Sequence, residues 1–167
     1  MCRVISYLGK SILIDKLFYK ADNSLVKQSY HPKQMSHILN LAGFGFAAWN
    51  KKLPEPRNPL LYKIYSLPFY DNNLRNISRK LYSNCLIAHV RGISYSEKNV
   101  VSAQNVHPFC FDNTTIAFAH NGSLVGFEEM RSDIYHYISN KYKKYICGTT
   151  DSETMYALFL SQLKKDQ

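Results

Sequence analysis

The residue types best suited to chemistry are a cysteine at position 2 and four short polar motifs spread along the chain. A methionine followed by a small residue is normally removed, which would leave Cys2 with a thiol and a free α-amine on one residue. An α-amine has a reference pKa of about 7.7–8.0, so its unprotonated fraction could act as base for the neighbouring thiol. Taken alone, position 2 favours the alternative that Cys2 is an ordinary apolar residue starting a strand.

Two of the motifs hold charged side chains that could bind opposite charges. AHVRG at 88–92 places Arg91 at the end of a predicted strand, where its planar fork could bind a carboxylate through two parallel hydrogen bonds. TDSE at 150–153 places Asp151 at a predicted helix start, where the helix dipole favours a carboxylate that could bind an ammonium group. The alternatives are a surface salt bridge for Arg91 and a simple helix cap for Asp151.

The other two motifs supply neutral groups. HNG at 120–122 could form an oxyanion hole from the Asn121 amide and the Gly122 backbone N–H, although a plain Asn-Gly turn is the alternative. NVHPF at 105–109 places His107 before a proline, where we expect it to shape a loop first and to take part in catalysis second. No His-rich or carboxylate cluster suggests a ligand set, so we expect neither a metal nor another cofactor.

Length and composition predict one globular domain over residues 1–167, with 46% hydrophobic and 20% charged residues. The net charge of +9 would suit a nucleic acid, an anionic surface or an acidic small molecule. The lysines are scattered in pairs, which favours a solvated surface. Four widely spaced cysteines without a C-x-x-C pair disfavour a zinc ribbon or redox motif. With no secretory segment or membrane-length apolar run, we expect a cytoplasmic location and no membrane association.

The elements that must position these residues follow from hydrophobic patterning. Apolar runs bounded by turn residues predict strands at 2–8, 41–50, 85–92 and 114–122, with a turn at 9–10 and a short element at 12–19. Helical spacing predicts helices at 72–83, 128–142 and 150–165. Polar or proline-rich composition predicts loops at 21–32, 51–68 and 97–109. Gly43 and Gly45 indicate close backbone contacts in the 41–50 strand.

Taken together, Cys2 and the motifs AHVRG, NVHPF, AHNG and GTTDSE resemble, in order and approximate spacing, those of the class II glutamine amidotransferases, which are N-terminal-nucleophile amidohydrolases. The stretches MCRVISYLG, SLVKQSY and LAGFGFAAWN are most similar to the small branch that hydrolyses γ-glutamyl amides in ergothioneine synthesis and glutathione breakdown. The resemblance extends from Cys2 to about Leu163.

This resemblance implies an α+β fold, the αββα four-layer sandwich. Family members usually continue with strands that complete the second sheet, whereas this chain stops just after the last predicted helix. We therefore expect a sandwich truncated at its C-terminal end, whose exposed sheet a protein partner or a homo-oligomer could complete.

The resemblance also implies roles for the motif residues. Cys2 would be the nucleophile and its α-amine the base, and Asn121 and Gly122 would form the oxyanion hole. Arg91 would bind the substrate's α-carboxylate and Asp151 its α-ammonium, with His107 in the substrate-binding set. The expected reaction is cleavage of glutamine or another γ-glutamyl amide, a small-molecule substrate, through a thioester on the cysteine.

Two other function classes remain as alternatives. The first is a catalytically inactive relative that acts as a binding or regulatory subunit, against which the retention of the motif residues argues. The second is a basic nucleic-acid-binding module, suggested by the positive charge and the 13 tyrosines. We disfavour that module because the aromatic residues mostly fall in apolar runs that should be buried.

Overall fold

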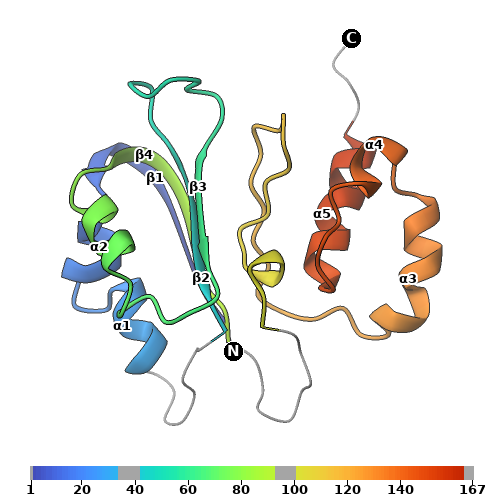
Figure 1. Cartoon of the computed structure of the whole chain (residues 1–167), viewed down its shortest axis with the longest axis horizontal. Coiled ribbons are helices and arrows are strands. Elements are labelled where there is room, and N and C mark those ends of the chain that lie inside the picture. The colour runs from blue at the N-terminus through green and yellow to red at the C-terminus, as the bar shows by residue number, and fades with distance from the viewer. Residues whose placement is uncertain (1, 34–41, 93–100, 164–167) are drawn as a thin grey trace.

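The computed structural model describes residues 2–33, 42–92 and 101–163, and one antiparallel sheet organises them. Its strands are β1 (Arg3–Leu13), β2 (Phe44–Trp49), β3 (Leu60–Ile64) and β4 (Tyr82–Val90), in the spatial order β1-β4-β2-β3 (Figure 1). Arg3 pairs with Val90, so the residues just before β1 and just after β4 meet at one end of the sheet.

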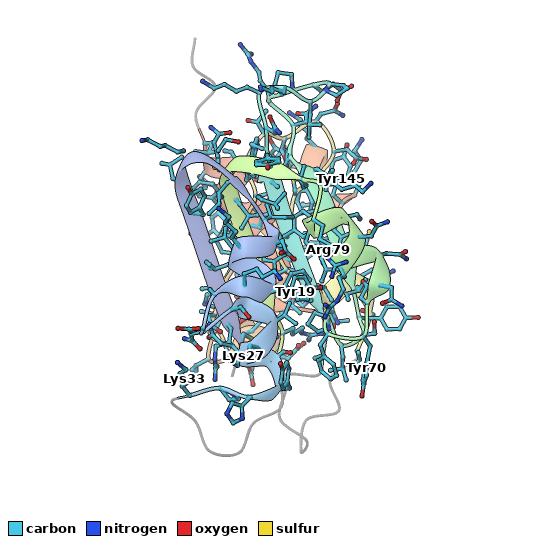
Figure 2. The ribbon with its side chains drawn as sticks, turned by 90° about the vertical axis from the view of Figure 1, so that its left-hand side faces the viewer. Tyr19, Lys27, Lys33, Tyr70, Arg79 and Tyr145 are labelled. Atoms are coloured by element: carbon cyan, nitrogen blue, oxygen red, sulfur yellow. The ribbon has the colours of Figure 1, made fainter. Side chains whose placement is uncertain are left out.

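One face of the sheet is covered by the helices of the first half of the chain. These are the π-helix η1 (Lys16–Lys20), α1 (Leu25–Tyr30) and α2 (Asn72–Ser78), which lie in front of the sheet in Figure 2. Phe18, Phe44 and Phe46 are fully buried between the two layers, with the Phe18 and Phe44 ring centroids 5.3 Å apart. Burial of these aromatic side chains, together with other apolar residues such as Ile14 and Leu74, stabilises this side of the sheet.

The segment from 101 to 125 lies over the other face of the sheet, and its backbone is largely extended (Figure 1). It contains the 3-10 turn η2 (Ala103–Asn105) and one isolated bridge, Phe109 to Phe118. A side chain at Gly45 of β2 would collide with the carbonyl oxygen of His107, so the glycine allows this segment to lie close against the sheet. The segment therefore forms a third layer over the sheet.

The last layer consists of α3 (Phe127–His136), α4 (Asn140–Lys143) and α5 (Asp151–Gln162) (Figure 1). A second apolar cluster joins these helices to the extended segment, with Phe109, Ile138 and Tyr156 among its buried members. The Thr150 hydroxyl accepts a hydrogen bond from the Glu153 backbone and caps α5 at its N-terminus. This cap fixes the point at which Asp151 enters the helix.

The structure confirms the expected mixture of helices and strands, and the strands pair antiparallel. The strands predicted at 2–8, 41–50 and 85–92 and the helices predicted at 72–83 and 150–165 are present with shifted ends. Gly43, whose φ is +128°, and Gly45 make the predicted close contacts. Position 41, the loop residues 97–100 and the lysines at 164 and 165 lie outside the described residues.

The predicted strand at 114–122 is wrong, because only Phe118 makes a bridge there. The backbone carbonyl of Ile116 accepts a hydrogen bond from the Tyr156 hydroxyl of α5 rather than from a neighbouring strand. Among the described residues the third layer is thus a pair of extended segments, and the second sheet of the expected sandwich is not formed.

Four further predictions need correction. No turn interrupts β1 at 9–10, since the strand continues to Leu13 with an irregular register after Leu8. The predicted 21–32 loop contains α1, a short helix in which only two of the three buried residues are apolar, so hydrophobic patterning gives little signal. The predicted 51–68 loop contains β3, an edge strand that lies between its prolines. The 128–142 helix is split into α3 and α4, where the Ser139 backbone donates to the Ser161 hydroxyl of α5.

Candidate active site

The sulfur of Cys2 lies where β1 begins and β4 ends, because the antiparallel pairing brings these points together. The Gly92 backbone N–H donates to Sγ at 3.4 Å, and Sγ is 3.4 Å from the Gly92 carbonyl oxygen. The carbonyl oxygen of Cys2 accepts from Asn121 Nδ2 at 3.1 Å and from Arg3 Nη1 at 3.0 Å. The residue is therefore held by its backbone while its half-buried thiol remains accessible.

One cavity of about 630 Å³ brings together most of the residues that the sequence predicts for the site. Cys2, Arg91, His107, Gly122 and Asp151 all line it. The Asn121 side chain is adjacent through its hydrogen bond to Cys2, which uses one of the two amide protons; no acceptor among the described residues takes the second. The six predicted residues thus converge from segments far apart in the sequence.

Arg91 reaches the cavity directly after β4. Its backbone N–H donates to the Gly43 carbonyl at 2.8 Å, and its carbonyl accepts from the Ala42 N–H at 3.1 Å. The residue is only 6% exposed, so Arg91 lies at the wall of the cavity and not on the open surface. A buried guanidinium at the wall of a cavity is suited to a planar carboxylate ligand.

Asp151 is fixed by neighbours on two sides. Its Oδ2 accepts from the Leu124 backbone N–H at 2.5 Å, and its Oδ1 accepts from the backbone N–H and hydroxyl of Ser152 at 2.6 and 3.0 Å. A carboxylate offers about four acceptor positions, so one remains on Oδ2. Asp151 also begins α5, where the helix dipole favours its negative charge. The group is therefore oriented and still able to accept a hydrogen bond from an ammonium ligand.

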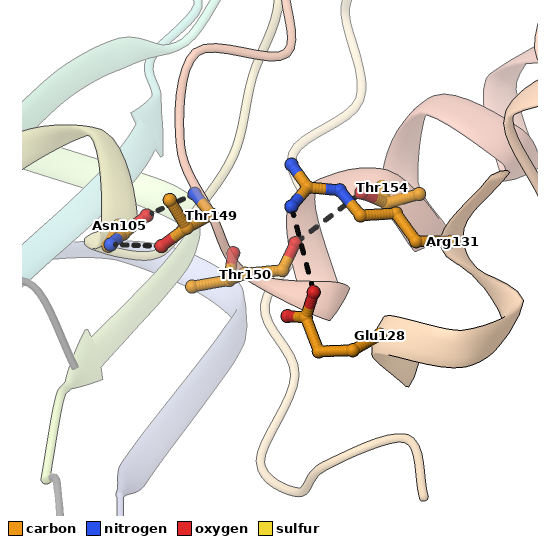
Figure 3. A network of polar contacts seen from close by, with 6 residues as sticks. All are labelled: Asn105, Glu128, Arg131, Thr149, Thr150 and Thr154. Carbon is orange, nitrogen blue, oxygen red and sulfur yellow. Dashed lines mark hydrogen bonds and ion pairs between the residues drawn. The ribbon is translucent and has the colours of Figure 1, made fainter. Parts of the chain in front are cut away.

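The start of α5 is itself anchored to the third layer (Figure 3). Asn105 donates from Nδ2 to the Thr149 hydroxyl at 3.0 Å and accepts from the Thr149 backbone N–H at 2.9 Å. The Thr154 hydroxyl approaches the Thr150 carbonyl oxygen at 3.5 Å. The Asn105 contacts tie the start of the helix that carries Asp151 to the segment that carries His107.

His107 and its neighbour His89 of β4 form a buried imidazole pair with ring centroids 4.4 Å apart. None of their four ring nitrogens has a hydrogen-bond partner within the described residues. Burial and then the Arg91 charge lower the pKa of His89 to about 4, although the nearby His120 backbone opposes the shift. Burial and then His89 lower the pKa of His107 to about 2. Both rings are therefore neutral at pH 7, and His107 presents an uncharged surface to the cavity.

Sequence reasoning missed two cavity residues that lie inside the motifs it identified. His120 precedes Asn121, and Ser152 follows Asp151. The His120 Nδ1 and the Ser152 hydroxyl are 3.1 Å apart, although 32 positions separate the residues in the chain. Their membership of the motifs was a signal, but only the fold reveals that they touch.

Outside this cavity, the cysteines and the metal-ligating side chains of the described residues bear on the zinc and redox chemistry considered from the sequence. All four cysteines are unpaired thiols. In the parts of the chain that are described, no three His, Cys, Asp or Glu side chains are arranged to hold a metal ion. Within the same parts, every helix is too short or too polar to cross a bilayer.

Comparison with known proteins adds a family and a set of relatives. The model for class II glutamine amidotransferases matches residues 66–167, which is more than half of the chain. A probable glutamine amidotransferase of Saccharomyces cerevisiae, DUG3, is 32% identical over 99% of this chain and 46% of its own length. A γ-glutamyl-hercynylcysteine sulfoxide hydrolase of Mycobacterium tuberculosis is 28% identical over 73% of this chain and 49% of its own length.

A solved structure is similar in fold. A glutamine aminotransferase class-II domain protein from Silicibacter pomeroyi matches with a TM-score of 0.62 and 23% identity, over 97% of this chain and 55% of that one. The chain therefore spans about half the length of the proteins that it matches.

Proposed function

This chain belongs to the class II glutamine amidotransferases, and we propose that it cleaves glutamine or another γ-glutamyl amide with the Cys2 thiol as nucleophile. The observation that carries the proposal is the cavity in which a thiol, a guanidinium and a carboxylate face one space. A glutamyl head group has one carboxylate and one ammonium, which this pair of opposite charges complements. The side chain of the glutamyl group separates this charged head group from the δ-carbonyl that the thiol attacks.

In the proposed mechanism the α-amine of a processed Cys2 takes the thiol proton, and the thiolate attacks the δ-carbonyl carbon. The oxyanion that forms accepts hydrogen bonds from the free Asn121 amide proton and the Gly122 backbone N–H. The α-ammonium then returns the proton to the departing amine as the carbon–nitrogen bond breaks, leaving a γ-glutamyl thioester. Water attacks the thioester, and glutamate and the thiol are released.

Arg91 and Asp151 act through binding in this scheme. Arg91 binds the α-carboxylate and the free position on Asp151 Oδ2 accepts from the α-ammonium, so the substrate is anchored at the end remote from the bond that breaks. Such anchoring converts binding energy into orientation of the reacting carbonyl. The neutral rings of His89 and His107 leave Arg91 as the cation that faces the carboxylate.

We also propose that the fold is the N-terminal-nucleophile sandwich, with the segment from 101 to 125 in the place of its second sheet. The order helix, sheet, extended segment, helix in Figure 1 supports this assignment. The relatives named for γ-glutamyl hydrolysis support a γ-glutamyl compound, rather than glutamine alone, as the class of substrate.

Covalent labelling tests the proposal directly. The glutamine analogue 6-diazo-5-oxo-norleucine should add to Cys2 in the wild-type protein, and intact mass followed by peptide mapping will locate it. Cys147→Ser is the matched control. It removes the exposed cysteine, which should not react, so this variant should be labelled as the wild type is. The Cys2→Ser variant should not be labelled at a comparable rate. Folded protein with a free Cys2 amine that remains unlabelled would reject catalysis and favour the inactive regulatory relative.

A further inference from the structure

We propose that Ser152 and His120 are positioning residues that hold the ammonium-binding carboxylate in register with the oxyanion donors, and so set the preference for substrates with an α-ammonium. The inference rests on the proposed function of Asp151. It concerns two side chains for which neither the family resemblance nor the relatives' names supply a role.

The direction of the hydrogen bonds follows from proton counting. The Ser152 hydroxyl has one proton and lies 3.0 Å from Asp151 Oδ1, an acceptor only. With that proton donated to Asp151, the His120 tautomer that complements the hydroxyl is the one with a proton on Nδ1, which lies 3.1 Å from the same oxygen. Ser152 is 2% exposed, so water does not compete readily for either bond. The result is a directed chain from His120 through Ser152 to Asp151.

The ring of His120 is fixed on both sides. On one side it stacks on Phe118 with centroids 6.4 Å apart, and Phe118 stacks in turn on Tyr156 of α5 at 5.8 Å. On the other side it lies against Gly122, where an added Cβ would be 2.9 Å from His120 Nε2. Glycine is therefore required at 122 for the ring to occupy this position.

This contact links the two halves of the site. Gly122 lies against the ring of His120. That ring is hydrogen-bonded to Ser152, which is in turn hydrogen-bonded to Asp151. The Asn121 side chain continues the connection to the Cys2 carbonyl oxygen at 3.1 Å. Loss of the Ser152 hydroxyl would remove one of the two hydrogen bonds to Asp151 Oδ1 together with the partner of the His120 ring. The backbone hydrogen bond from Ser152 to Oδ1 and the cap of α5 on Thr150 would stay in place.

Equilibrium binding tests the inference without requiring turnover. Calorimetry will compare L-glutamate with glutarate, which has both carboxylates and lacks the α-ammonium. The wild-type protein should prefer L-glutamate. Ser152→Ala should weaken L-glutamate binding by roughly 10- to 100-fold, the usual effect of losing a hydrogen bond to a charged group, and change glutarate binding by no more than about twofold.

A double-mutant cycle separates positioning from general damage. His120→Phe preserves the ring stack and removes the donor, so it should reduce the preference in the same direction as Ser152→Ala. The double variant should lose little more than the larger single loss, because both changes break one chain. Ser161→Ala is the matched control on α5, where that hydroxyl bonds to the Ala157 carbonyl and to Ser139, and it should bind both ligands as wild type does.

The outcomes are distinct. Equal losses for both ligands in Ser152→Ala, losses that multiply in the double variant, or a wild-type protein without preference for L-glutamate would each overturn the inference. Retained preference in the wild type and its loss in Ser152→Ala support it even if Cys2 is not labelled by the diazo analogue. That combination would reject the proposed catalysis and keep the positioning role.

Discussion

The buried pair of His89 and His107 should make the protein unusually sensitive to mild acid. In the unfolded chain both imidazoles titrate near 6.5, whereas in the folded protein the pKa of His89 is about 4 and that of His107 about 2. A folded pKa below the unfolded one means that the unfolded state binds more protons. The stability that this pair contributes is therefore fully present above pH 6.5 and is lost as the pH falls through that value.

The magnitude follows from linkage. Each pH unit below 6.5 costs about 1.4 kcal/mol per ring until the folded pKa is reached. At pH 5 the loss is about 2 kcal/mol for each ring, or about 4 kcal/mol for the pair. The cations Arg91 and Lys63 contribute to these lowered pKa values together with burial, whereas the His120 backbone favours the protonated form of His89.

Urea unfolding at pH 8 and pH 5, followed by circular dichroism, measures this loss. Other groups also titrate over the range, so the comparison is between variants. His89→Leu removes one ring of the pair and should reduce the loss between the two pH values by about 2 kcal/mol. His136→Asn is the matched control, because His136 is exposed on α3 and should leave the loss unchanged.

If the free energy of unfolding falls by the same amount between pH 8 and pH 5 in wild type and in His89→Leu, the reasoning is refuted. The ring would then be either solvated or already protonated in the folded protein. A loss reduced equally by His136→Asn would refute it as well.

Three shorter predictions concern the site and its support. Asn121→Ala should lower kcat on a γ-glutamyl amide by roughly 10²- to 10³-fold with a native circular dichroism spectrum, and an unchanged kcat would remove Asn121 from the oxyanion hole. Arg91→Lys keeps the charge but not the two-pronged donor, so KM should rise by about tenfold or more, and steady-state kinetics with an unaltered KM would contradict carboxylate binding. Gly45→Ala should cost about 1–3 kcal/mol in urea unfolding because its Cβ meets the His107 carbonyl, whereas Gly9→Ala meets only the movable end of Tyr7 and should cost much less.

The parts of the fold that sequence predicts well are those governed by local signals. The last helix has a hydroxyl cap, acid in its first turn and an apolar face, and α5 is present where expected. The strand around Gly45 has both apolar content and the glycines that close packing needs. The motif order was enough to identify the family, as the match over residues 66–167 confirms.

The errors occur where a distant partner overrides local preference. The 114–122 segment has the composition of a strand, yet the carbonyl of Ile116 bonds to Tyr156, which is 40 positions away. Likewise α3 ends where Ser139 finds the Ser161 hydroxyl. Neither partner can be identified from local pattern, because a hydrogen bond across layers depends on which surfaces meet.

What this sequence determines by itself is the set of groups: a thiol beside the start of the chain, one cation, one carboxylate and a turn with neutral donors. Their assembly is a property of the tertiary structure. The pairing of β1 with β4 brings Cys2 to Gly92 across 90 positions, and the packing of the third layer on α5 brings His120 to Ser152 across 32. Such contacts are set by sheet register and by the burial of aromatic side chains between layers, and these are satisfied only when the whole chain is folded.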